Sequence, residues 1–115
     1  MITLLPLHKL IREYDFVPQA IILEPVFEVA KRFGSDVEEG EDDLDQYLGA
    51  AALLDEHWPF AVMHYRGHPK DTTTLYLPFK VRNIDDVTKI ISMIVDALKI
   101  PETSIKWQRK DNPEL

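Results

Sequence analysis

The stretch PFAVMHYRGHPKDTTTLYLPFKVR, residues 59–82, decides the fold. Apolar and polar side chains alternate along residues 72–82, as they do in a strand with one buried and one solvated face. Residues 59–66 instead offer apolar side chains to both faces, which is typical of a central strand that is covered on both sides. Gly67 and Pro69 favour a turn between the two segments. We therefore predict a β-hairpin at the centre of a sheet.

The segment before the hairpin, residues 44–55, permits two interpretations. One is a helix capped by Asp43, and the other is a buried strand. Gly49 weakens a helix interior, and residues 55–58 make a plausible turn into the hairpin. We therefore favour a strand over residues 48–54.

Two short helices are predicted nearer the N-terminus. Pro6 fits the first turn of an amphipathic helix that runs to about Tyr14. Residues 25–33 open with a proline and are followed by a glycine, which favours a second helix, with a strand as the competing interpretation. Residues 21–23 are open to either strand or helix.

The clearest helix follows the hairpin. Asn83 is a favourable N-cap, and the apolar pattern runs to about Ile100, where Pro101 follows. Residues 103–109 alternate again and predict a last strand, whereas the polar tail 110–115 is expected to fray. The expected fold is a single α+β domain with a three- or four-stranded, largely antiparallel sheet and helices packed mainly on one face.

The composition excludes several classes of structure and function. The chain has no cysteine, so it can contain neither a disulfide nor a thiolate metal site nor a cysteine nucleophile. No apolar run approaches the roughly 20 residues of a membrane-spanning helix, and the N-terminus lacks the features of a secretory signal. We expect a cytoplasmic protein that does not span a membrane.

Negative charge is concentrated in one segment. Residues 1–56 contain 4 Lys and Arg against 13 Asp and Glu, and seven of these carboxylates lie within residues 36–45. We interpret residues 35–45 as a solvated loop that projects from the fold and attracts a basic protein partner. An EF-hand calcium loop does not fit, because Gly40 arrives at the fifth position rather than the sixth when the count begins at Asp36. The candidate partner-binding residues are Glu38, Glu39, Glu41, Asp42 and Asp43.

A second candidate site is the segment 57–70, which is rich in histidine and positive charge. Imidazole is a common metal ligand, and Arg and Lys side chains beside a glycine turn can hold an anion. Because Gly67 and Pro69 make the segment a turn, spacing alone does not predict that the rings converge. The candidate ligand-binding residues are His57, His64, Arg66, His68 and Lys70. We assign no catalytic residue, metal site or cofactor.

Two hypotheses of function follow. The first is a small acidic interaction module without catalytic activity, inhibitor-like or antitoxin-like, which presents the acidic segment to a basic partner. The alternative is a small enzyme or ligand-binding protein that uses residues 57–70. Nucleic acid ranks below a protein partner because the chain is acidic overall. A homodimer is expected, because the helix over residues 84–100 is apolar around most of its circumference and must meet a further surface.

Overall fold

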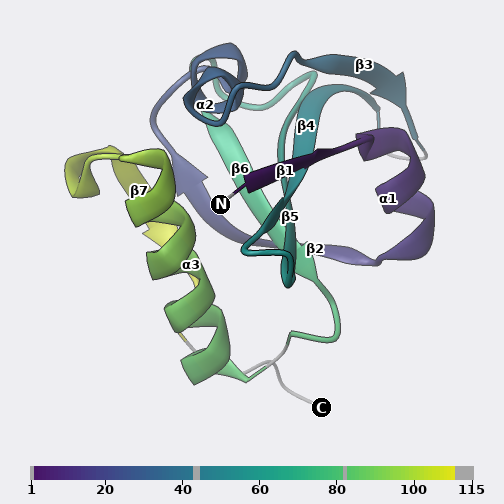
Figure 1. The fold of residues 1–115 in the computed structure, drawn as a ribbon. Helices are drawn as coiled ribbons and strands as arrows, with labels where there is room; N and C mark the ends of the chain where they lie inside the picture. Colours follow the sequence, from purple (N-terminus) through teal and green to yellow (C-terminus); the bar gives the residue numbers. More distant parts are fainter. Residues whose placement is uncertain (1, 43–44, 82, 111–115) are drawn as a thin grey trace.

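The computed structural model describes residues 2–42, 45–81 and 83–110 (Figure 1). These residues form seven strands, three α-helices and one 3-10 turn. In chain order the elements are β1 (Ile2–Leu5), α1 (Leu7–Glu13), β2 (Phe16–Ile22), α2 (Val26–Arg32), β3 (Glu38–Glu41), β4 (Gln46–Leu54), β5 (Trp58–Tyr65), β6 (Thr73–Pro78), α3 (Ile84–Leu98), the 3-10 turn (Glu102–Ser104) and β7 (Ile105–Gln108). None of the described helices combines the length and the apolar character needed to cross a lipid bilayer.

The seven strands form one antiparallel sheet. Six of them follow each other in the order β1, β4, β5, β6, β2, β7, and β3 pairs with β4 beside that path. The short strands β1 and β3 lie end to end along the same edge of β4, β1 against residues 51–54 and β3 against residues 46–49. The predicted sheet of three or four strands is therefore wrong in size, although the α+β class agrees with the structure.

The strands that the sequence did not predict carry weak local signals. β2 contains Pro18, which lacks the N–H group that a strand ladder uses, and its pairing with β6 shifts register between Pro18 and Ala20. β3 has the sequence EEGE and forms by pairing with β4. The interpretation of residues 35–45 as a projecting loop is therefore wrong for residues 38–41, which are part of the sheet.

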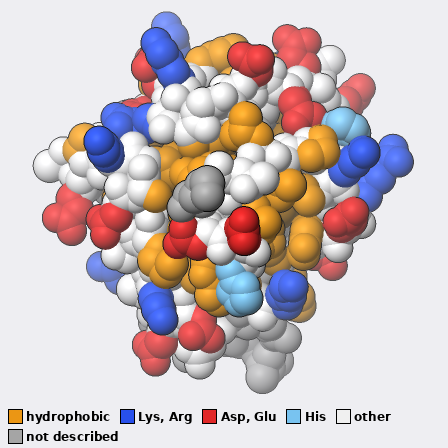
Figure 2. Space-filling model, viewed as in Figure 1, with side chains coloured by type: hydrophobic (Ala, Val, Ile, Leu, Met, Phe, Trp, Pro, Cys, Tyr) orange, Lys and Arg blue, Asp and Glu red, His pale blue; other side chains and the backbone are white. Residues whose placement is uncertain are grey.

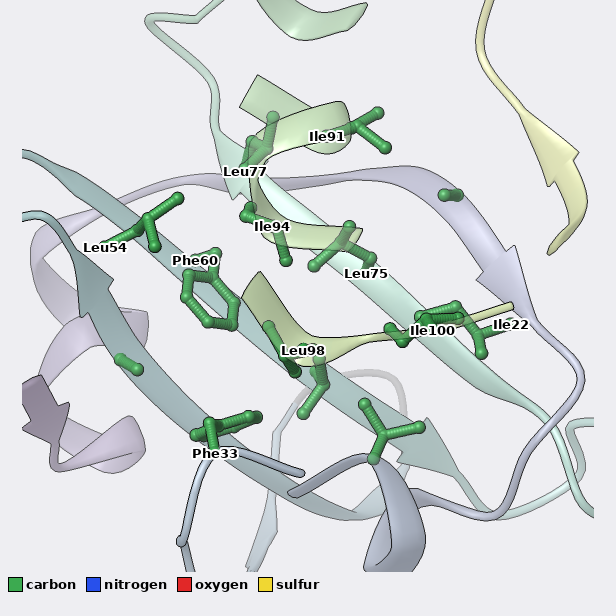
Figure 3. Packing of buried hydrophobic residues seen from close by; sticks show 14 of the residues in the cluster. Ile22, Phe33, Leu54, Phe60, Leu75, Leu77, Ile91, Ile94, Leu98 and Ile100 are labelled. Carbon is green, nitrogen blue, oxygen red and sulfur yellow. The ribbon is translucent and has the colours of Figure 1, made fainter. Parts of the chain in front are cut away.

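One face of the sheet is covered by α2 and α3. α3 is the helix predicted after the hairpin: the Asn83 side chain accepts a hydrogen bond from the Asp85 backbone N–H at 2.9 Å, and Lys99 ends the helix in the left-handed conformation. The buried hydrophobic side chains on this face are aliphatic apart from Phe33 and Phe60. Figure 3 shows several of them from the helix and from the sheet, among them Phe60, Leu75, Leu77, Ile91, Ile94 and Leu98.

The opposite face is partly covered by α1. Leu7 and Leu10 of this helix are buried in a second cluster with Tyr47, Tyr65 and Tyr76 of the sheet. Both predicted N-terminal helices are confirmed, since α1 and α2 each begin directly after a proline. Two of the three described helices share one face, and α1 is the exception to the expected one-sided packing.

The central hairpin is confirmed as β5 and β6, and the strand favoured over residues 48–54 is part of β4. The prediction that the second arm has one solvated face is wrong, because every residue of Thr73–Pro78 is buried. The strand also ends at Pro78 rather than Arg82. Buried threonine is tolerated because its hydroxyl bonds to nearby backbone, as in the 2.7 Å hydrogen bond from Thr73 Oγ1 to the Glu24 carbonyl. The last predicted strand corresponds to β7. Fraying was predicted for residues 110–115, of which 111–115 lie outside the described residues.

Candidate functional site

Glu38 fastens the acidic strand β3 to helix α1. Its carboxylate accepts hydrogen bonds from the Leu7 backbone N–H at 2.6 Å and pairs with His8 Nδ1 at 2.9 Å. Partial burial opposes ionisation, but the hydrogen bonds from His8 and Leu7 outweigh it and hold the pKa of Glu38 below its usual value. This predicted partner-binding carboxylate is therefore engaged within the chain.

Asp42 fastens the end of β3 to the central hairpin. Its Oδ2 accepts a 2.5 Å hydrogen bond from the Tyr65 hydroxyl, and its Oδ1 accepts one from the Asp45 backbone N–H at 3.3 Å. Burial and this contact with a carboxylate raise the pKa of Tyr65 well above its usual value. The neighbouring candidate Asp43 lies outside the described residues.

Glu39 and Glu41 project from the other face of β3, because side chains alternate along a strand. Strand register places Glu39 opposite Leu48 of β4, and Leu48 in turn opposite His64 of β5. Two residues further along the same face, Glu41 lies opposite Gln46. The Gln46 carbonyl accepts a hydrogen bond from the backbone N–H of Arg66, the residue after β5. On this surface, β3 therefore presents Glu39 and Glu41, β4 presents Gln46 and Leu48, and β5 presents His64.

These residues line a shallow depression of about 560 Å³, here called the acidic groove. Its lining side chains include Glu39, Glu41, Gln46, Leu48, His64 and Arg66. Adjacent strands are about 4.8 Å apart, so the backbones that carry Glu39 and His64 are separated by about 10 Å. A direct acid–base pair between these two side chains is therefore not formed by the fold. The described residues also contain no group of three or more His, Asp or Glu side chains arranged to hold a metal ion.

His64 has a defined hydrogen-bond role in the groove. Its Nδ1 lies 2.8 Å from the Thr72 carbonyl oxygen. A carbonyl oxygen only accepts, so Nδ1 carries the proton of the neutral ring and Nε2 keeps its lone pair. Arg66, the residue after β5, lies 3.5 Å from the Asp45 carboxylate through Nε.

Of the other candidate ligand-binding residues, His68 lies beside His64, with ring centroids 5.9 Å apart, although it does not line the groove. His57 is in the turn between β4 and β5, at the end of β5 opposite to His64, and its ring packs on Trp58 with centroids 4.8 Å apart. His68 packs on the Tyr65 ring at 5.5 Å and accepts a long, 3.4 Å hydrogen bond from the Tyr65 backbone N–H. Lys70 is exposed in the turn before β6.

The acidic groove combines parts of two segments that sequence reasoning treated as separate sites. Glu39 and Glu41 come from the acidic segment, and His64 and Arg66 come from the hairpin. Gln46 and Leu48 were not considered as site residues, and the only sequence signal that could have found them is the strand favoured over residues 48–54, which runs beside the hairpin. Their position depends on the register between β3, β4 and β5, which local patterns do not specify.

Comparison of the chain with models of known protein families, with curated proteins and with solved structures finds no match.

Proposed function

We propose that the protein binds a basic, extended segment of a protein partner in the acidic groove and that it does so without catalysis. The observation that carries the proposal is the column of two exposed carboxylates, Glu39 and Glu41, beside the apolar side chain of Leu48. A lysine or arginine side chain has the matching chemistry, since its aliphatic stem packs on apolar surface while its charged end pairs with a carboxylate.

The spacing of the two carboxylates favours an extended ligand. Glu39 and Glu41 are alternate residues of a strand, so their attachment points are about 7 Å apart. Alternate residues of an extended peptide have the same separation. A segment with Lys or Arg at every second position can therefore place one charge on each carboxylate, whereas adjacent charged residues project to opposite sides.

The β5 side of the groove, opposite the two carboxylates, carries the basic side chains of His64 and Arg66. Arg66 donates hydrogen bonds, and His64 Nε2 accepts one when the ring is neutral. Peptide carbonyl and N–H groups in the bound segment can use these two partners. This arrangement supports binding of a polypeptide in a fixed direction.

The separation of acid and base supports binding over chemistry. Glu39 and His64 lie two strands apart, and general acid–base catalysis needs groups within hydrogen-bond reach of one reacting atom. Of the candidate ligand-binding residues over 57–70, His64 and Arg66 line the groove, and the His68 ring packs against His64. Inhibition of a basic partner, as in the inhibitor-like or antitoxin-like role, is one use of such a surface.

A pair of designed peptides tests the proposal. One carries lysine at alternate positions, and the other has the same composition with its lysines adjacent. Fluorescence anisotropy should show tighter binding of the alternating peptide. Glu39→Gln combined with Glu41→Gln should weaken that binding by about tenfold or more, since each lost charge-assisted contact is worth about 1 kcal/mol or more.

The matched control removes two carboxylates elsewhere. Glu13 at the end of α1 and Glu56 in the turn between β4 and β5 are both exposed, so Glu13→Gln combined with Glu56→Gln changes the net charge equally. This control should bind the alternating peptide within about twofold of the parent, because loss of a distant charge acts only through screened potential. Equal loss in both variants would show nonspecific attraction to an acidic protein and would contradict a defined groove.

The predictions of a homodimer and of a cytoplasmic location stay predictions. The flanks of α3 that suggested the homodimer are only partly exposed at Met93 and Val95. Figure 2 shows hydrophobic side chains gathered over the middle of the face that β1 crosses, where Leu4 is 49% exposed.

A further inference from the structure

The far edge of the sheet has a surface opposite in charge to the acidic groove. β7 is the last strand of the sheet order and pairs only with β2 among the described residues. A depression of about 770 Å³ lies along it, and its lining includes Lys106, Trp107, Arg109 and Lys110 together with one acidic residue, Glu102. Both lysines are exposed, and Trp107 keeps 43% of its surface exposed. We call Lys106, Trp107 and Lys110 the basic edge.

The acidic strand lies at the other end of the same sheet. β3 is separated from β7 by β4, β5, β6 and β2, which corresponds to roughly 24 Å of strand spacings. Figure 1 shows β3 and β7 on opposite sides of the molecule. One chain therefore cannot bring its own basic edge against its own β3, whereas a second copy can.

We infer that the basic edge of one copy docks against the acidic strand β3 of a second copy, head to tail. The charges are complementary, since Lys106 and Lys110 are exposed along one depression and Glu39 and Glu41 are exposed along the other. Trp107 supplies a large apolar side chain at the centre of the contact, and tryptophan is enriched in the cores of protein interfaces. The inference rests in part on the proposed function, because both use Glu39 and Glu41.

A symmetric pairing of two basic edges is disfavoured. It would bring Lys106 and Lys110 of one copy close to the same residues of the other, and like charges in an interface oppose association. The contact also differs from strand addition: β7 carries Lys106 as an extra residue at the register shift between Ile21 and Ile22, and bulges and lysines on an edge strand hinder backbone pairing. The docking is therefore carried by side chains.

A head-to-tail contact leaves one free acidic and one free basic surface, so assemblies grow with concentration. The net charge of −7 repels copies at long range, and the complementary surfaces act within about 10 Å at roughly 0.1 M salt. Light scattering at about 0.1 M salt and up to about 100 μM protein should show a mass at least twice the 13.3 kDa of one chain. At about 1 M salt, where screening acts within about 3 Å, the mass should return to that of one chain.

Two variants separate this contact from other modes of association. Glu39→Gln combined with Glu41→Gln removes the acidic side, and Lys106→Gln combined with Lys110→Gln removes the basic side. Each variant alone should stay monomeric. Their equimolar mixture should form a two-chain complex and grow no further, because one intact acidic surface then meets one intact basic surface.

Three outcomes would overturn the inference. The first is a parent protein that stays monomeric over the whole range. The second is a mixture that stays monomeric. The third is a dimer that persists in both variants, which would indicate a symmetric interface such as the apolar area around β1. The basic-edge variant retains Glu39 and Glu41, so its binding of the alternating peptide tests the proposed function separately.

Discussion

On the face of the sheet beneath α2 and α3, the buried hydrophobic side chains are aliphatic or phenylalanine, whereas the cluster beneath α1 contains three tyrosines. Tyr47, Tyr65 and Tyr76 bury their rings but carry hydroxyl groups that need hydrogen-bond partners. The Tyr65 hydroxyl donates a hydrogen bond to Asp42, and this bond joins the acidic segment to the hairpin. The tyrosine face therefore positions β3, while the aliphatic face beneath α2 and α3 holds the larger of the two hydrophobic clusters.

From this difference we expect substitutions on the two faces to have different effects on the protein. A void on the aliphatic face should lower the stability of the whole domain, because that core joins the sheet to α2 and α3. A change on the tyrosine face should loosen α1 or β3 and with them the acidic groove, since Glu38 and Asp42 tie these elements together.

The largest effect is expected for Ile91→Ala. Ile91 is 1% exposed in the aliphatic core, so its truncation loses transfer energy and leaves a cavity. The free energy of unfolding in urea should fall by about 2 to 5 kcal/mol. Met93→Ala on the partly exposed flank of α3 is the control and should cost less. A loss below about 0.5 kcal/mol at Ile91, the range of surface substitutions, would contradict its place in the core.

Gly49→Ala should have an intermediate effect on the tyrosine face. A Cβ at this position would lie 2.6 Å from Leu7 Cδ2 and 2.8 Å from the Val62 carbonyl oxygen. The second contact is with backbone and cannot be relieved by a change of side-chain rotamer. We expect a loss of about 1 to 3 kcal/mol in the free energy of unfolding, the usual range for an overpacked core.

The double variant with Leu7→Ala checks the cause of that loss. Removing the Leu7 side chain relieves one of the two close contacts, so Gly49→Ala should cost less in the Leu7→Ala background than in the parent. Strictly additive losses would mean that α1 does not pack on Gly49.

Much of the fold follows from local pattern. α3 was predicted because its apolar stripe repeats over four turns and Asn83 caps it, and the hairpin was predicted from its apolar first arm and its turn residues. The alternation over residues 72–82 misled, since Thr72, Thr74 and Tyr76 of the expected wet face are buried, and the Thr72 hydroxyl donates a hydrogen bond to the Pro69 carbonyl. Polarity alone does not distinguish a solvated face from a buried one whose polar groups are satisfied.

The acidic groove could be predicted only in pieces. Both segments that contribute to it were singled out for their charge, but about twenty residues separate Glu41 from His64 in the chain. They meet because β3 pairs with β4, and nothing in the sequence EEGE itself favours a strand. β3 is held in place by distant partners, Leu7 and His8 for Glu38 and Tyr65 for Asp42. Such contacts depend on the assembled fold.

The smallest effect at neutral pH is expected for Tyr65→Phe, which removes the hydrogen bond to Asp42. Because Asp42 is partly exposed and can be hydrated, the loss should be about 1 kcal/mol at pH 7. The larger difference is expected in alkali. Burial and the contact with Asp42 raise the pKa of Tyr65, and burial with the charge of Asp42 raises the pKa of Tyr76 to about 12.

The sign of the pH dependence follows from these directions. A raised pKa means that the folded state holds the proton more tightly than the unfolded state, so the stabilisation is complete below about pH 10, the ordinary tyrosine pKa. It is lost as the pH rises through the folded-state values. Tyr65→Phe should therefore reduce the alkaline fall in the free energy of unfolding by up to about 1.4 kcal/mol per pH unit, leaving the contribution of Tyr76.

Asp42→Asn is the matched variant, because it keeps an oxygen acceptor for the Tyr65 hydroxyl but removes the charge. Since that charge raises the pKa of both Tyr65 and Tyr76, the variant should also reduce the alkaline fall. Urea unfolding between pH 7 and about pH 11 measures the fall, and ultraviolet absorbance of tyrosinate reports the ionisation. If the parent and Tyr65→Phe lose stability in parallel over this range, the Tyr65 hydroxyl is not buried against Asp42, and β3 is held by its pairing with β4 and by the contacts of Glu38 with α1.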